Sequence, residues 1–224
     1  MAGKTHSNPI LQRKIRLKTN HAQRVHHRGF GRTSNSLHRV DVVLQIISDQ
    51  KSVDEVEQII DELFDQYLTD IGQEQARLAS LLESNGITGE PEYTNPLDVS
   101  VEISSPQVSR LVRVLEQFEN LVVAIDTLWL YGVFNNKQRK DSIYEWQRRS
   151  LRLGNRIVDI EKRAQRAAHN NGQDEEVAAK LGDTGLVTAE AEEEASDMPA
   201  VDGADSKDDT DEDAESEVRI AAAG

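Results

Sequence analysis

The sequence predicts a mainly α-helical protein with a short β ribbon near its amino terminus. Two observations support this fold class. Apolar residues recur at helical spacing over long segments between positions 36 and 169, whereas the basic segment 11–18 alternates between polar and apolar residues. A third observation, the Asp- and Glu-rich composition after position 171 with no aromatic residue, predicts a disordered acidic tail.

These features divide the 224 residues into four expected parts. Residues 1–10 are a flexible amino terminus, and residues 11–50 form a basic, ribbon-helix-helix-like part. Residues 51–170 form a core of long helices that also serves dimerisation, and residues 171–224 form the tail.

Charge is strongly segregated along the chain, whose formal net charge is −14. Residues 1–40 carry +9, residues 41–173 carry −8 and residues 174–224 carry −15. Because local fields attract partners, the basic end is suited to a polyanion such as nucleic acid. The acidic tail is interpreted as a solvated segment, with autoinhibition or contact with a partner as the alternative.

The residue types exclude several classes of protein. Without cysteine, disulfides and cysteine-bound zinc are ruled out, and the cytoplasm of a bacterium is the expected location. No membrane span is expected, since the longest apolar region, 121–134, is short and contains Asp126. No catalytic or phosphate-binding motif occurs, so we expect neither an enzyme nor a cofactor. His21, His26 and His27 lack neighbouring acidic ligands, which argues against a metal site.

Periodicity and end signals place the core elements. Ser105 followed by Pro106 is typical of a helix start, and the apolar residues after it predict a central helix that is covered on nearly all sides. The segment "LDVSVEI" (97–103) alternates like a half-buried strand. The other helices are expected at 36–48, 52–83 and 141–169, with a hinge at 49–51 and a loop at 85–96.

The last predicted helix has an apolar seam from Trp146 to Ala167 and a basic stripe beside it. The stripe is interrupted by Asp159. It is either a solvated face with local ion pairs or a phosphate-contacting surface. The stripe consists of Arg149, Arg152, Arg156, Arg163 and Arg166.

The segment "LQRKIRLK" (11–18) is the main candidate for a functional surface. In a strand, its polar side chains share one face, while Leu11, Ile15 and Leu17 share the other, with Arg13 as the exception. Paired antiparallel with the same strand of a second copy, it would form a ribbon narrow enough for the DNA major groove. Lys and Arg suit guanine and Gln suits adenine. The expected DNA-contacting residues are Gln12, Arg13, Lys14, Arg16 and Lys18.

The residues that follow are compatible with two helices separated by a turn. Thr19 or Asn20 can cap a short first helix, and Gly29 to Gly31 can form the turn. The second helix would then begin near Thr33 or Ser34, and its amino terminus could hold a DNA phosphate. The expected phosphate-contacting residues are Arg32, Thr33 and Ser34.

The strand predicted at 97–103 is a competing ribbon. Its polar face would consist of Asp98, Ser100 and Glu102. Two carboxylates would repel phosphates, so we expect this strand to be structural.

Two segments, "IRLKTNHAQRV" (15–25) and "DTLWLYGVFNNKQRKDSIYEWQRR" (126–149), resemble a family of proteins encoded on integrating conjugative elements and IncC-type conjugative plasmids. The resemblance covers most of the expected folded part but not the acidic tail. It implies a ribbon-helix-helix transcriptional activator of conjugative-transfer genes, with the ribbon function at Lys14, Arg16 and Lys18.

Together, the residues and the resemblance predict a homodimeric regulator that binds double-stranded DNA sequence-specifically. It would be associated with the nucleoid when bound, with RNA polymerase as a further candidate partner and no membrane partner. The alternative is a noncatalytic structural or adaptor protein of a conjugative element, in which the basic segment is a nonspecific arm.

Overall fold

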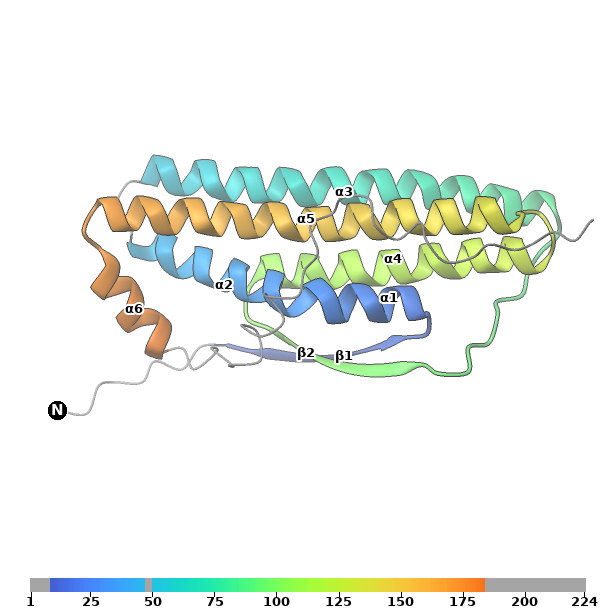
Figure 1. Cartoon of the computed structure of the whole chain (residues 1–224), viewed down its shortest axis with the longest axis horizontal. Coiled ribbons are helices and arrows are strands. Elements are labelled where there is room, and N and C mark those ends of the chain that lie inside the picture. Colours follow the sequence, from blue (N-terminus) through green and yellow to red (C-terminus); the bar gives the residue numbers. More distant parts are fainter. Residues whose placement is uncertain (1–8, 47–49, 184–224) are drawn as a thin grey trace, which may run out of the picture.

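A computed structural model describes residues 9–46 and 50–183 of the chain. The helices form an elongated bundle, and two strands lie along one side of it (Figure 1). The structure confirms a mainly helical fold with a short two-stranded antiparallel sheet. In chain order the elements are β1 (Leu11–Leu17), α1 (Asn20–Val25), a π-helical turn (His26–Phe30), α2 (Gly31–Ile46), α3 (Gln50–Ser84), β2 (Leu97–Ile103), α4 (Pro106–Leu130), α5 (Asn136–Asn170) and α6 (Asp174–Asp183).

Helix α4 is the central helix, as its sequence predicts. The Ser105 side chain accepts a hydrogen bond from the backbone N–H of Val108, and Pro106 occupies the first turn. Most of its apolar side chains are buried, and those of Phe118 and Ile125 are completely buried. The helix is covered by α3, α5, α1 and the two strands.

The two longest helices, α3 and α5, have different main packing partners. Helix α3 packs against α4, and α5 packs against α2. The seam of α5 is buried from Trp146 to Ala164, as its spacing predicts, but near the end of the helix Ala168 is buried rather than Ala167.

The ribbon forms within one chain. Strand β1 pairs antiparallel with β2, and Lys14 stands opposite Ser100 at its centre. This corrects the expectation that β1 pairs with the same strand of a second copy. Alternation determines which side chains face the core, but it does not determine which strand supplies the neighbouring backbone. Here β2 supplies it, and Val101 joins the same hydrophobic core as Ile15 and Leu17.

The turn predicted at Gly29 to Gly31 is helical instead. Helix α1, the π-helical turn and α2 follow one another directly, so no helix begins at Thr33 or Ser34. Thr19 does cap α1, because its side chain accepts a hydrogen bond from the backbone N–H of Ala22. One of the two caps proposed for the first helix is therefore confirmed.

Helical structure continues past the predicted start of the tail at residue 171. Helix α6 packs on α2, and its Val177 is buried in a cluster with Val42, Val43 and Ile46. Described helical structure therefore extends to Asp183, past the boundary predicted at residue 170. Residues 1–8, residues 47–49 and residues 184–224 of the expected tail lie outside the described residues. Of the hinge predicted at 49–51, residue 49 is therefore not described, whereas residues 50 and 51 are the first two of α3.

Within the described residues, none of the helices combines the length and the apolar character needed to cross a membrane.

Candidate nucleic-acid interface

The solvent face of the ribbon is formed by alternate residues of both strands. On β1, Gln12, Lys14 and Arg16 are exposed, whereas Ile15 and Leu17 are 6% and 1% exposed. From Lys14 to Leu17 the strand therefore has the two faces that its alternation predicts, whereas Leu11 at its start is 63% exposed. Because its apolar side is packed in the core, this basic segment is a fixed structural element.

Strand β2 contributes acidic and neutral side chains to the same face. Each of them lies beside a side chain of β1, because the strands are in antiparallel register. The charge of this face, which was expected to be basic, therefore depends on the side chains of both strands. The cross-strand partners on this face are Gln12 with Glu102, Lys14 with Ser100, and Arg16 with Asp98.

Two of these cross-strand pairs interact directly. Gln12 Nε2 donates a hydrogen bond to Glu102 Oε1 at 2.5 Å, and Arg16 Nε lies 3.9 Å from Asp98 Oδ1. Within the described part of the chain, the Lys14 side chain has no ion pair or hydrogen bond. The two cations on this face are balanced by two carboxylates, so the face has no formal net charge.

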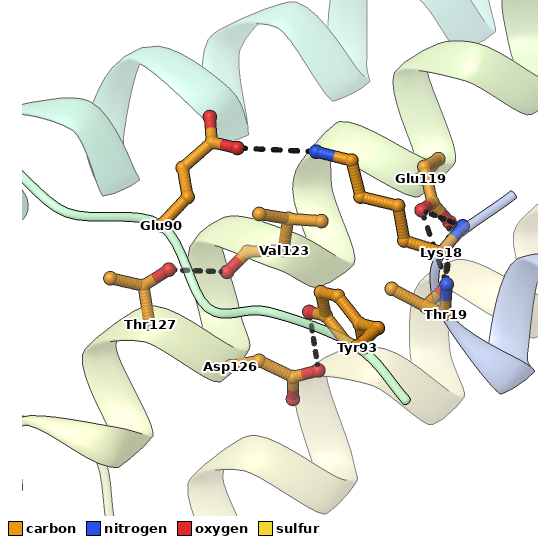
Figure 2. Close-up of polar contacts among 8 residues, drawn as sticks. All are labelled: Lys18, Thr19, Glu90, Tyr93, Glu119, Val123, Asp126 and Thr127. Carbon is orange, nitrogen blue, oxygen red and sulfur yellow. Dashed lines mark hydrogen bonds and ion pairs between the residues drawn. The ribbon is translucent and has the colours of Figure 1, made fainter. Parts of the chain in front are cut away.

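Arg13 and Lys18 are held by acidic residues outside the ribbon. The Arg13 guanidinium lies 2.7 Å from Glu116 Oε1 on α4. Lys18 Nζ lies 3.2 Å from Glu90 Oε2 on the loop 85–96 (Figure 2). Both pairs are partly exposed, so each contributes at most about 1 kcal/mol, and DNA phosphates could replace either carboxylate.

A buried carboxylate, Glu119 of α4, holds the junction between β1 and α1. It accepts hydrogen bonds from the backbone N–H of Lys18 at 2.6 Å and from the N–H and hydroxyl of Thr19 at 3.1 and 2.7 Å (Figure 2). Burial raises the pKa of Glu119, while these hydrogen bonds act in the opposite direction. Sequence reasoning missed this residue. Its only signal is an acid between Phe118 and Leu121 on the buried side of an apolar helix.

A second buried carboxylate, Asp126, anchors the loop that carries Glu90. The Tyr93 hydroxyl donates a hydrogen bond to Asp126 Oδ2 at 3.0 Å (Figure 2), and Arg139 Nε donates to Oδ1 at 2.6 Å. Burial, and then the charge of Asp126, raise the pKa of Tyr93, so its hydroxyl stays a hydrogen-bond donor at neutral pH. Lys18 and Glu90 are therefore both carried by backbone that α4 holds in place.

The predicted phosphate-binding helix end is absent at Arg32, Thr33 and Ser34. Thr33 is 3% exposed, and its hydroxyl donates a hydrogen bond to the Gly29 carbonyl at 2.8 Å within the continuous helix. Because α2 continues directly from the preceding turn, this position has no free helical N–H groups for an anion. Without a helix start at this position, the geometry on which their predicted phosphate contact depends is missing.

Two of the clustered histidines and one arginine of the basic stripe on α5 contact neighbouring side chains of the protein. His21 Nδ1 lies 3.3 Å from Gln147 Oε1, and the His26 ring stacks on Phe30. One residue of the stripe, Arg149, pairs with Glu145 at 2.5 Å, which is a local pair of the kind expected for a solvated face. Over the described ranges, no group of three or more His, Cys, Asp or Glu side chains is placed to hold a metal ion.

Comparison with known proteins identifies the family. The crystal structure of selenomethionine-containing AcaB from uropathogenic E. coli is similar to this chain, with a TM-score of 0.77 and 39% sequence identity. The match covers 86% of this chain and 100% of that chain. No protein-family model and no curated protein matches the chain. Identity and coverage at this level confirm the family resemblance seen in segments 15–25 and 126–149, and the chain belongs to the AcaB family.

Proposed function

We propose that this protein is a sequence-specific double-stranded DNA-binding regulator, an activator of conjugative-transfer genes, that reads the major groove with the β1–β2 ribbon. The observation that carries the proposal is the exposed face of β1, from which Gln12, Lys14 and Arg16 project into solvent. A two-stranded ribbon fits the major groove, where Lys and Arg can bind guanine and Gln can bind adenine. Membership of the AcaB family supports the regulatory context.

The packing of the ribbon favours base recognition over generic binding. The buried Ile15 and Leu17 keep the strand in one register, so the outward side chains start from defined positions. The adaptor alternative needs a loose basic arm that attracts phosphates by charge. A packed strand, whose face has as many carboxylates as cations, is a poor anchor of that kind.

Two predicted partners besides DNA remain proposals. We propose RNA polymerase as the protein partner, because an activator can act by contacting it. A second copy of the chain was expected to complete the ribbon. Because β2 completes it, a homodimer would need another surface.

The test begins with selection from a pool of random-sequence duplexes, using the full chain at about physiological salt. Affinity for the selected duplex and for a scrambled duplex is then measured as salt rises. The variant K14A/R16A/K18A should lose its preference for the selected duplex at least tenfold, since each good base contact contributes about 1–3 kcal/mol. The control variant K137A/K140A/K162A removes the same charge from exposed positions on α5 and should keep the preference.

Two results would contradict the proposal. The wild-type chain could enrich no motif and bind both duplexes equally, with affinity falling steeply as salt rises, which would favour the adaptor. Alternatively, the ribbon variant and the α5 variant could lose the same amount of preference, which would place recognition outside the ribbon.

A further inference from the structure

The chain is built from two strand-helix-helix halves with matching lengths. Strands β1 and β2 begin 86 residues apart and end 86 residues apart. The same offset separates both ends of α3 from those of α5. Between strand and long helix, the first half has α1, the π-helical turn and α2, and the second half has α4. Each half is therefore a strand, a first helical segment and a long second helix.

The hydrogen bonds at the helix starts repeat with the same offset. The Thr19 hydroxyl oxygen accepts from the N–H of Ala22 at 3.2 Å, and the Ser105 hydroxyl oxygen accepts from the N–H of Val108 at 3.3 Å. Thr19 and Ser105 are 86 residues apart, and so are the two donors. The two first helices thus begin with the same cap.

The long helices also end in the same way. An Asn-Gly pair follows each of them, at 85–86 and at 171–172, and the two glycines have φ of 67° and 71°. This left-handed conformation is accessible to glycine, and it closes the helix with paired backbone hydrogen bonds. The matching bonds are Ile87 N–H to the Leu82 carbonyl at 2.9 Å and Gln173 N–H to the Ala168 carbonyl at 3.0 Å.

Burial follows the same repeat although most side chains differ. In the long helices, several residues 86 apart are buried together. In the first helices the offset is 86 before the π-helical turn and 85 after it, since such a turn inserts one residue. The buried pairs are Ala22 with Val108, Leu37 with Val122, Val40 with Ile125, Ile60 with Trp146, Phe64 with Ser150, Tyr67 with Leu153, and Ile71 with Ile157.

The ribbon lies on the axis that relates the two halves. Lys14 pairs directly with Ser100, which is its own equivalent 86 residues later. A two-fold axis through the ribbon requires this register, and two copies of one strand would meet in the same way. Also consistent with the axis, α2 packs on α5 as α4 packs on α3. One chain therefore contains the arrangement that two copies of β1 were expected to form.

We infer that this protein is a fused ribbon-helix-helix pair and that a single chain recognises a DNA site without two-fold symmetry. The inference rests on the proposed function and specifies its DNA substrate. Its basis is that the two strands share a backbone plan but not their outward side chains. The equivalent outward positions are Gln12 and Asp98, Lys14 and Ser100, and Arg16 and Glu102.

The chemistry of these positions makes the two halves of the ribbon read different bases. Lys14 and Arg16 donate to the guanine acceptors, and Gln12 suits adenine. Asp98 and Glu102 can accept hydrogen bonds from the amino group of cytosine. The two carboxylates also lower the attraction of the ribbon for phosphates, which weakens binding to DNA of any sequence. A palindromic site would present the wrong groups to β2.

The test converts β2 into a copy of β1 on its outward face, with the variant D98Q/S100K/E102R. All three positions are exposed, so the change does not enter the core. Duplex selection is performed with the wild-type chain and with the variant, and native mass spectrometry counts the chains on a duplex that carries one motif. The wild type should select a motif without two-fold symmetry and bind it as one chain. The variant should select a two-fold symmetric motif, half of which matches the wild-type motif.

A two-fold symmetric motif selected by the wild type, or an unchanged motif selected by the variant, would overturn the inference while leaving DNA recognition intact. No motif from the wild type would overturn the proposed function itself.

A second variant, D98N/E102Q, keeps the shapes of the side chains and covers the case in which the triple variant does not fold. It should bind scrambled DNA several-fold more tightly and change base preference in one half of the motif only. Unchanged preference in both halves would contradict the inference.

Discussion

Glu119 of α4 accepts hydrogen bonds from both the backbone amide and the hydroxyl of Thr19, and so joins the start of α1 to the central helix. Removing a buried acceptor leaves its donors without partners. E119A should therefore lower the free energy of unfolding by about 2–4 kcal/mol, measured by urea denaturation. The control E116A breaks only the partly exposed ion pair with Arg13 and should cost less than about 1 kcal/mol. Similar losses in both variants would show that the buried hydrogen bonds of Glu119 contribute no more to stability than the partly exposed ion pair of Glu116.

Gly154 of α5 is required because α2 approaches it closely. A Cβ at this position would lie 2.5 Å from the Thr33 hydroxyl oxygen. G154A should push the helices apart and lower stability by about 1–3 kcal/mol in thermal unfolding.

Gly72 of α3 is the matched control for that substitution. A Cβ there would have no neighbour within 4 Å, so G72A should raise stability by about 0.5–1 kcal/mol through helix propensity. The two substitutions are expected to change stability in opposite directions. This prediction is contradicted if both alanine variants shift the melting temperature in the same direction.

Asp41 of α2 makes the fold sensitive to pH. Burial raises the pKa of Asp41 to about 6, a hydrogen bond with Ser105 opposes the shift, and the charge of Glu57 adds to it. The folded state therefore holds this proton more tightly than the unfolded chain does. The resulting stabilisation is complete below about pH 4 and is lost as the pH rises through about 6.

The substitution D41N removes that titration. Unfolding free energies measured from pH 4 to pH 8 should fall less steeply in D41N than in the wild type, with a difference of at most about 3 kcal/mol. E92Q, at an exposed position, serves as the control and should keep the wild-type slope. A D41N slope identical to that of the wild type would exclude Asp41 as the source.

Lys14 and Lys18 should contribute to DNA binding in different ways. Lys14 lies at the centre of the ribbon, whereas Lys18 lies beyond its end and is already paired with Glu90. K14A should reduce the preference for the selected duplex about tenfold or more. K18A should weaken binding to all duplexes alike and reduce the salt dependence by about one phosphate contact. The comparison is made by fluorescence anisotropy at several salt concentrations, and interchanged effects would contradict it.

Local signals were enough to predict most of the helices and both strands. Ser105 and Pro106 start α4 as expected, and the alternation of 97–103 gives β2 its correct limits. The turn at Gly29 to Gly31 was mispredicted because glycine permits a turn without requiring one. Burial of Phe30 in the core favours the helix at this point, and tertiary packing outweighs the weak local preference.

For the candidate site, the sequence predicts which side chains of each strand are exposed, but not which two strands pair. A period of two predicts that Lys14 and Arg16 are exposed, and they are. It cannot predict that Asp98 and Glu102 occupy the same face, because that depends on which strands pair. Thr19 was recognised as a cap from local sequence, but its bond to Glu119 joins residues far apart in the chain and has no local pattern.

The pairing of β1 with β2 also removes a dissociation equilibrium. A ribbon assembled from two chains comes apart on dilution, and its formation depends on the square of the protein concentration. Here the connecting elements keep β2 beside β1 at an effective concentration on the order of millimolar or higher. The ribbon surface is therefore complete in every folded molecule, however few molecules a cell contains.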